Sequence, residues 1–196
     1  LAQVKKRAGE LFEFNPMLGK RGVRLAISMP EIYEMQAKAI FEAFILVNGT
    51  HQQEQLSELE IMIPLVSANT EVELIKDRLN RIACEIGEKT KIKVNYKLGV
   101  VVETPRAALR AEDLASSCDF FSFGTNDLTQ MTYGLSRDDA GRFMREYLEN
   151  EVFLKDPFHS LDLEGVGELI KLACDRGKTK NPKLILGLCG EHGGDP

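Results

Sequence analysis

The sequence has no hydrophobic run that approaches the length of a membrane span, and its first residues show no signal-peptide pattern. Its lysines and arginines do not gather into a cluster that could follow a phosphate backbone, and its formal net charge is −5. These absences argue against a membrane protein and against a nucleic-acid-binding protein.

Motifs for common cofactor sites are also missing. The four cysteines are scattered and include no Cys-x-x-Cys pair, so neither a zinc site nor a redox motif is indicated. Reduced thiols in an intracellular protein are the simple interpretation. No Gly-x-x-x-x-Gly-Lys-[Ser/Thr] loop occurs, and no Gly-x-Gly-x-x-Gly follows a predicted strand, so the sequence does not support nucleotide binding in this chain.

What the chain does contain is an alternation of strands and helices. Its 196 residues, 43% hydrophobic and 28% charged, have the composition of one soluble globular domain over residues 1–196. Buried strands are predicted at 61–66, 98–102, 119–123 and 183–189, and the principal helices at 30–47, 70–86, 105–116, 138–150 and 161–176. Such spacing predicts an α/β fold with a parallel sheet, for which a doubly wound sheet and a (β/α)₈ barrel both fit.

Helix start signals support these ranges. Pro30 and Pro105 stand where a first helical residue is expected. Thr70 and Glu73 have the spacing of a capping box, which predicts that a helix begins between them.

Polar side chains follow three of the predicted strands at the point where each strand ends. Glu103 comes directly after one strand, Asn126 and Asp127 follow the next, and Cys189 ends the last. Because the carboxyl ends of parallel strands form one face, these residues should converge. One acidic residue after a strand is often only a helix cap, and Asp127 alone could be one. Three consecutive strands that end this way indicate an active site.

The stretch 184–196 supports the same interpretation. Cys189 is followed within six residues by Glu191, His192 and Asp195, separated by glycines that permit tight backbone paths. Alone, this pattern fits an active-site loop and an ordinary buried thiol beside a turn equally well. The predicted convergence of the strand ends decides for the active site.

The residue types restrict the chemistry. Two carboxylates and an amide oxygen are hard ligands suited to Mg²⁺, and a thiol beside the ion could act as a nucleophile or exchange protons. Arg21 lies between glycines on a predicted loop at 15–24, where its guanidinium could meet an anion. The residues therefore predict a Mg²⁺-dependent site for a small anionic substrate.

Six segments, in order along nearly the whole chain, carry a family resemblance: Asn-Pro-Met-Leu-Gly-Lys-Arg-Gly (15–22), Glu-Ile-Met-Ile-Pro-Leu-Val (60–66), Glu-Thr-Pro-Arg-Ala-Ala-Leu (103–109), Phe-Phe-Ser-Phe-Gly-Thr-Asn-Asp-Leu-Thr-Gln (120–130), Ser-Arg-Asp-Asp-Ala (136–140) and Gly-Leu-Cys-Gly-Glu-His-Gly-Gly-Asp-Pro (187–196). The chain resembles the C-terminal, phosphoenolpyruvate (PEP)- and pyruvate-binding barrel of the PEP-utilising enzymes. Within that family it is most similar to the pyruvate, phosphate dikinases.

The resemblance implies a role for each site residue. Glu103 and Asp127 would hold Mg²⁺, and Arg21 would neutralise the phosphoryl group during transfer. Cys189 would give a proton to C3 of the pyruvate enolate and take it back in the reverse direction. Further substrate contacts would come from Asn126 and the backbone of Gly124 and Thr125. The roles of Glu191 and His192 stay open, between orienting Cys189 and lying at the surface.

The same resemblance implies a wider setting. It predicts a (β/α)₈ barrel of which this chain is a central, incomplete portion, without the ATP-binding domain or the swivelling phosphohistidine domain of the full-length protein. The reaction would convert pyruvate, ATP and phosphate to PEP, AMP and pyrophosphate, and the isolated chain would be inactive. The expected partners are PEP or pyruvate, the phosphohistidine domain and a second copy in a homodimer. A cytoplasmic location comes first, with a plastid or a glycosome also open.

Two alternatives remain at this point. A PEP–protein phosphotransferase (enzyme I) or a PEP synthase would use the same barrel and signatures for a different overall reaction. A non-catalytic barrel that serves dimerisation or regulation belongs to a different class. The joint presence of Arg21, Glu103, Asn126, Asp127 and Cys189 argues against this last alternative.

Overall fold

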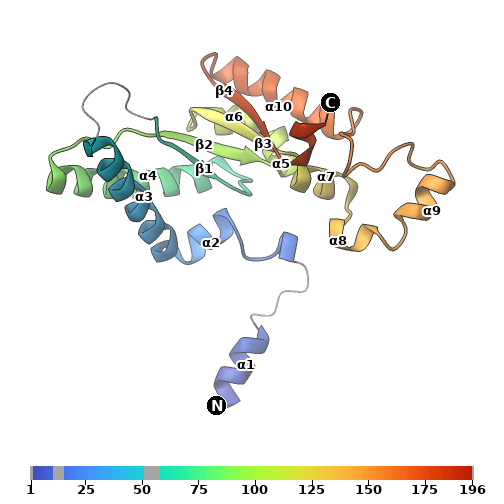
Figure 1. Cartoon of the computed structure of the whole chain (residues 1–196), viewed down its shortest axis with the longest axis horizontal. Helices are drawn as coiled ribbons and strands as arrows, with labels where there is room; N and C mark the ends of the chain where they lie inside the picture. The colour runs from blue at the N-terminus through green and yellow to red at the C-terminus, as the bar shows by residue number, and fades with distance from the viewer. Residues whose placement is uncertain (1, 11–15, 51–57, 196) are drawn as a thin grey trace.

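A parallel β-sheet lies at the centre of the computed structural model, which describes residues 2–10, 16–50 and 58–195. Its four strands lie side by side in chain order (Figure 1): β1 (Glu60–Ile63), β2 (Lys97–Val102), β3 (Phe120–Gly124) and β4 (Ile185–Cys189). Every link between neighbouring strands contains helix, as parallel pairing requires. The predicted α/β class is therefore confirmed, with one parallel sheet.

Helices precede the sheet and connect its strands. Before β1 come α1 (Ala2–Glu10), the 3₁₀ turn η1 (Pro16–Leu18), α2 (Val23–Ser28) and α3 (Pro30–Thr50). β1 is linked to β2 by α4 (Asn69–Thr90), and β2 to β3 by α5 (Pro105–Leu109) and α6 (Ala111–Ala115). Four helices link β3 to β4: α7 (Thr125–Tyr133), α8 (Arg137–Ala140), α9 (Met144–Glu149) and α10 (Val166–Lys180). The 3₁₀ turn η2 (Glu191–Gly194) follows β4. No helix within the described ranges is both long and apolar enough to cross a membrane.

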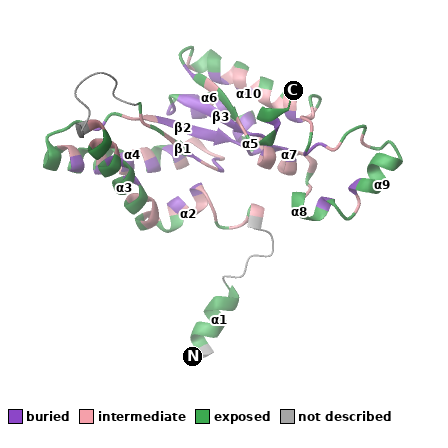
Figure 2. Cartoon of the chain, in the orientation of Figure 1, coloured by how far each residue is buried: buried purple, intermediate pink, exposed green. Residues whose placement is uncertain are grey.

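One face of the sheet is apolar and packs against helices. Side chains alternate along a strand, so Leu98, Val100 and Val102 of β2 share a face, and the register adds Phe121 and Phe123 of β3. These five residues belong to one buried cluster together with apolar side chains of α4, α5, α6 and α10. Figure 2 shows that β2 and β3 are the buried strands of the sheet, whereas β4 is mostly exposed. The core of the molecule thus lies between one sheet face and its connecting helices.

The opposite face is different in character towards the carboxyl ends of the strands. Val101 of β2, Ser122 of β3, and Gly187 and Cys189 of β4 alternate onto it. Val101 is buried but lies outside the cluster that packs against the helices. A hydroxyl, a thiol and a glycine therefore lie on the sheet face opposite the apolar cluster.

The predicted strand at 61–66 is too long. β1 ends at Ile63, because Pro64 has no N–H to continue the ladder and the chain turns there. The carbonyl of Pro64 instead accepts a hydrogen bond from the N–H of Val23, at 3.0 Å. The end of β1 is consequently tied to the start of α2, where the sequence predicts only a loop.

The predicted capping box of Thr70 and Glu73 is wrong. The carboxylate of Glu71 accepts hydrogen bonds from the N–H groups of Ser67, at 2.7 Å, and Ala68, at 3.0 Å. α4 accordingly begins one residue before Thr70.

Four other helices differ from their predicted ranges, and the first of them, α3, extends three residues beyond its predicted end at residue 47. The helix predicted at 105–116 is interrupted at Arg110, whose φ and ψ of −108° and 24° are not helical, so α5 and α6 are separate. The predicted helix at 138–150 is likewise divided into α8 and α9. α10 starts later than predicted because the carboxylate of Asp162 accepts from the N–H groups of Glu164, Gly165 and Val166. Asn15, which opens the first family segment, lies outside the described residues, as do both ends of the predicted domain.

Candidate active site

The carboxyl ends of β2, β3 and β4 bring predicted site residues together. Gly124 of β3 pairs in register with Cys189 of β4, and Val102 of β2 pairs with Phe123 of β3. Glu103, the residue after Val102, therefore lies level with Gly124 and Cys189 in one row across the sheet. Asn126 and Asp127, in the first turn of α7, come directly after β3. The predicted convergence of strand ends is therefore observed in the geometry, although it does not test the chemical roles.

Gly124 makes room for the Glu103 carboxylate. A Cβ atom on Gly124 would lie 2.5 Å from Oε2 of Glu103, 2.9 Å from its Cβ and 2.9 Å from Cγ1 of Val101. These separations are well below van der Waals contact, so any side chain at position 124 would displace the carboxylate or β2. The glycine of the Gly-Thr-Asn-Asp segment is a spatial requirement of the site.

Arg21 reaches the same place from the N-terminal part of the chain. Its Nη2 donates to Oδ2 of Asp127 at 2.6 Å, and its Nε donates to the carbonyl of Met17 at 3.2 Å. The next residue, Gly22, has a φ of +56°, which favours glycine, and a Cβ there would lie 3.0 Å from the Pro64 carbonyl oxygen. A tight turn packed against the end of β1 thus directs Arg21 towards the carboxylates.

Glu103 is a buried carboxyl group with an altered acidity. Only 8% of the residue is exposed, and Oε1 accepts a hydrogen bond from the N–H of Leu65 at 2.7 Å. The pKa of Glu103 is raised to about 7, mainly by burial and also by the neighbouring Asp127 carboxylate, whereas the Leu65 N–H and the Arg21 guanidinium oppose the rise. The protein holds two carboxyl groups close together in a place where ionising both is unfavourable.

This pair fits a divalent cation. A cation between Glu103 and Asp127 would offset the repulsion and the burial that raise the Glu103 pKa, and both groups are hard oxygen ligands. Among the described residues, no group of three or more His, Cys, Asp and Glu side chains could hold a metal ion. A cation here would depend on the two carboxylates, with water and substrate oxygens as its other ligands, an arrangement typical of Mg²⁺.

Cys189 has a hydroxyl neighbour that the sequence did not indicate. The Ser122 hydroxyl donates to Sγ of Cys189 at 3.1 Å, across the pair β3–β4. All four cysteines are free, and Cys118 is buried in the apolar core. Only Cys189 stands at the strand ends, next to a hydrogen-bond donor and on the face of the sheet that carries Ser122.

Polar contacts fix the loop after Cys189 to the start of α7. The Asn126 side-chain oxygen accepts from the N–H of Glu191 at 3.1 Å, and the Glu191 carboxylate receives two hydrogen bonds from the Arg137 guanidinium, at 2.8 and 2.5 Å. The Gln130 amide donates to Asp127 at 3.1 Å and accepts from the N–H of Arg137 at 2.8 Å. Arg137 was not identified from the sequence as part of the site. Its position in the family segment 136–140 was the only available sign that it contacts the loop after Cys189.

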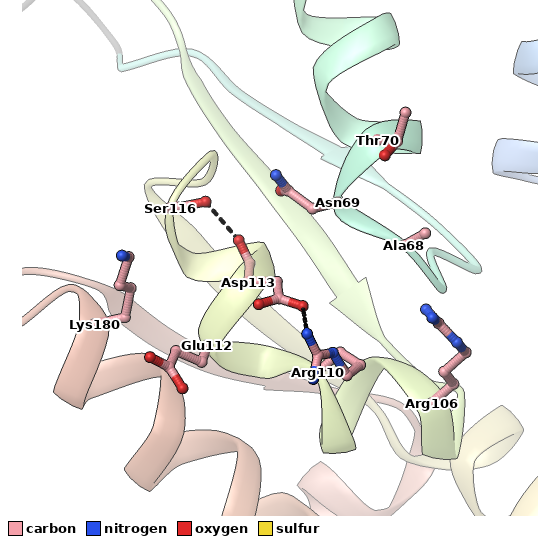
Figure 3. Close-up of a pocket in the computed structure, with 9 residues that line it drawn as sticks. All are labelled: Ala68, Asn69, Thr70, Arg106, Arg110, Glu112, Asp113, Ser116 and Lys180. Atoms are coloured by element: carbon pink, nitrogen blue, oxygen red, sulfur yellow. Dashed lines mark hydrogen bonds and ion pairs between the residues drawn. The ribbon is translucent and has the colours of Figure 1, made fainter.

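A separate cavity of about 550 Å³ lies beside the start of α4 and along α5 and α6 (Figure 3). It contains the side chains of Arg106, Arg110 and Lys180, but Arg110 is paired with Asp113 and Arg106 donates to the carbonyl of Ser67. Protein groups therefore already engage two of its three cations. None of the predicted site residues lines this cavity, and we assign no function to it.

Comparison with known proteins adds an independent finding. The family model described as "PEP-utilising enzyme, PEP-binding domain" matches residues 3–196. The chain is 52% identical to "Pyruvate, phosphate dikinase" of Rhizobium meliloti (strain 1021), 47% to that of Clostridium symbiosum, and 50% to "Pyruvate, phosphate dikinase 1, chloroplastic" of Oryza sativa subsp. japonica. These alignments cover 98–100% of this chain but only 20–22% of each relative, so the chain spans about a fifth of their length.

Proposed function

The chain belongs to the PEP-utilising enzymes, as their PEP-binding domain, and from this premise we propose that it hosts the pyruvate/PEP half-reaction of a pyruvate, phosphate dikinase. The complete reaction would interconvert pyruvate, ATP and phosphate with PEP, AMP and pyrophosphate. The observation that carries the proposal is the meeting of Arg21, Asp127 and Glu103 at the strand ends, in the row that also contains Cys189. A guanidinium, two carboxylates and a thiol are what phosphoryl transfer to an enolate needs.

Each residue has a defined task in the proposed half-reaction. Towards PEP, the Cys189 thiolate removes a proton from C3 of pyruvate, and the C–H electron pair becomes the C2=C3 bond of the enolate. The enolate oxygen attacks the phosphorus of a phosphohistidine, so an O–P bond forms while the N–P bond breaks and neutral histidine leaves. Arg21 neutralises the charge of the phosphoryl group during this transfer. In reverse, the Cys189 thiol protonates C3 of the enolate.

We assign Glu103 and Asp127 as the residues that hold Mg²⁺. When bound, the ion would stabilise the negative charge on the enolate and phosphoryl oxygens as a Lewis acid. Gln130 holds the Asp127 carboxylate through Oδ1, and the Leu65 N–H holds Glu103 through Oε1. Asn126 and the backbone of Gly124 and Thr125 would contact the substrate beside this pair.

For the fold, we propose four of the eight strands of a (β/α)₈ barrel, with residues 1–196 forming part of the PEP/pyruvate-binding domain. The packing supports a barrel over a doubly wound sheet, because one sheet face carries the apolar cluster against α4, α5, α6 and α10. The other carries Ser122 and Cys189, as an inward-facing barrel surface with a site at its carboxyl end would.

The proposed partners follow from the half-reaction. A phosphohistidine domain of the same full-length protein would bring the phosphoryl group to PEP or pyruvate, and an ATP-binding domain would charge it. We further propose a homodimer and an intracellular location, cytoplasmic in the first instance. The four free cysteines fit a reducing compartment.

The test uses the full-length protein supplied with PEP, AMP and Mg²⁺, with and without pyrophosphate, while pyruvate and ATP are measured. We expect ATP formation that requires pyrophosphate and is lost in Cys189→Ala. Cys84→Ala, which changes an exposed thiol on α4, is the matched control and should retain activity. Pyruvate release without a pyrophosphate requirement would instead identify a PEP synthase or an enzyme I. Absence of Mg²⁺-dependent PEP binding would favour a non-catalytic barrel.

A further inference from the structure

His192 is a buried imidazole that joins three parts of the chain next to the candidate site. It lies in η2, three residues after Cys189, and only 7% of it is exposed. Nδ1 is 2.8 Å from Oγ1 of Thr125, and Nε2 is 2.9 Å from the carbonyl oxygen of Pro157. The loop after β4, the first turn of α7 and the segment between α9 and α10 therefore meet at this ring.

The partners determine which nitrogen carries the proton. A carbonyl oxygen only accepts hydrogen bonds, so Nε2 of His192 must be the donor to Pro157. In the neutral imidazole Nδ1 is then an acceptor, and the Thr125 hydroxyl must donate to it. The direction of the Thr125 hydroxyl is thus set by the imidazole.

Thr125 in turn contacts the backbone that carries Cys189. Thr125 is completely buried, and its Oγ1 lies 3.3 Å from the carbonyl oxygen of Cys189. A Cβ on Gly190 would be 2.6 Å from the same Oγ1, so the hydroxyl packs directly against the Cys189–Gly190 backbone. The same hydroxyl also donates to the Cys189 carbonyl, so Thr125 bridges the His192 imidazole, at the shorter distance, and the Cys189 backbone. Removal of the imidazole would release this hydroxyl to form a different bond.

We propose that His192 is a positioning residue for Cys189, acting through the Thr125 hydroxyl and anchored at the Pro157 carbonyl. The imidazole itself takes no part in proton or phosphoryl transfer. This inference rests on the proposed function, since it assigns His192 to the step in which Cys189 exchanges the C3 proton of pyruvate. A displacement of a reacting group by about 1 Å can cost on the order of a hundredfold in rate, so the thiol step should be sensitive to this anchor.

Two substitutions at position 192 separate hydrogen bonding from packing. His192→Gln keeps an N–H donor for Pro157 and an oxygen acceptor for Thr125, whereas His192→Leu keeps bulk and loses both bonds. Thr125→Val removes the hydroxyl at nearly constant shape and offers a second route if His192→Leu fails to fold. The full-length protein with Mg²⁺ is used throughout.

The decisive measurement is the exchange of pyruvate C3 protons with deuterated solvent, followed by NMR, alongside the affinity for PEP. We expect His192→Leu and Thr125→Val to slow exchange by about ten- to a hundredfold, with PEP affinity within about threefold of the unmodified protein. His192→Gln should restore most of the rate. Unchanged exchange in the folded Leu or Val variant, or an equal loss in the Gln variant, would overturn the inference.

Two further results separate this inference from the proposed function. If the unmodified protein shows no Mg²⁺-dependent exchange, the proposed function fails and takes the role of His192 with it. If exchange is normal but insensitive to His192, only the inference fails. The ¹⁵N NMR signal of His192 in the full-length protein, identified by its loss in His192→Gln, gives a readout independent of activity. A proton on Nε2 is expected, and a proton on Nδ1 alone would refute the hydrogen-bond assignment.

Discussion

Gly124→Ala is the substitution whose effect follows most directly from the geometry of the site. The added Cβ would stand 2.5 Å from Oε2 of Glu103 and 2.9 Å from both the Glu103 Cβ and Cγ1 of Val101. The carboxylate cannot simply swing away, because Oε1 is held by the Leu65 N–H at 2.7 Å and the residue is buried. The other two atoms lie close to the β2 backbone, so the strand itself must shift.

The expected cost is that of overpacking a filled interior, about 1–3 kcal/mol of unfolding free energy. For a protein of this size each 1 kcal/mol lowers the melting temperature by roughly 2–4 °C. Because the displaced group is a proposed ligand of Mg²⁺, PEP affinity should fall by at least about tenfold, which corresponds to roughly 1.4 kcal/mol. Urea unfolding and calorimetric titration with PEP and Mg²⁺ measure the two effects separately.

Gly141→Ala is the matched control. Position 141 has a helical φ of −56°, and no atom lies within 4 Å of a Cβ built there. The same chemical change should leave PEP binding unaltered and raise the unfolding free energy slightly, by about 0.4–1 kcal/mol. If Gly124→Ala were as harmless as this control in both assays, the close approach of Glu103 to Gly124 would be refuted.

Two other predictions concern ionisation. In metal-free buffer the folded protein keeps a proton on Glu103 between pH 4.5 and about 7 that the unfolded chain has lost. The stability that this proton contributes is fully present below pH 4.5 and is lost as the pH rises to about 7, a change of roughly 3 kcal/mol. In urea titrations at several pH values, Glu103→Gln should remove this decline, whereas Glu60→Gln, at an exposed position, should keep it. If the unfolding free energy of Glu103→Gln still fell with pH as in the unmodified protein, the raised pKa of Glu103 would be contradicted. Burial raises the pKa of Cys118 to about 12. At pH 8, iodoacetamide should therefore label the exposed Cys84 and spare Cys118, as measured by mass spectrometry. Rapid labelling of Cys118 in the folded protein would show that it is not buried.

The sheet and the residues at its carboxyl end were predictable because both follow from local pattern. Apolar runs that stop at Glu103, Gly124 and Cys189 give the strands, and parallel pairing then brings their ends together. The roles of the site residues remain predictions, since the geometry only brings the groups into one place. Arg21 could be assigned to the site only through the family resemblance, because its approach depends on a contact with Asp127, 106 residues away.

What could not be predicted depends on contacts between distant segments. Ser122 looks like an ordinary strand residue until β4 brings the Cys189 sulfur beside it. His192 gave no sign of its partners because Pro157 is 35 residues earlier in the chain. The interruption at Arg110 is similar, since residues 105–116 contain no proline or glycine at the break and show helical periodicity throughout.

The order of the strands has a consequence for how the site comes into existence. Each strand pairs with the one before it in the chain, so no earlier pair has to wait for a later strand. Protein synthesis proceeds from the N-terminus, so a growing chain can add one strand after another to the same edge. The arginine and both carboxylates are in place once β3 and the first turn of α7 have formed. The thiol arrives last, with β4, and a nascent chain that stops short of residue 185 holds the groups proposed to bind an anion and a cation, but not the thiol proposed to move a carbon-bound proton.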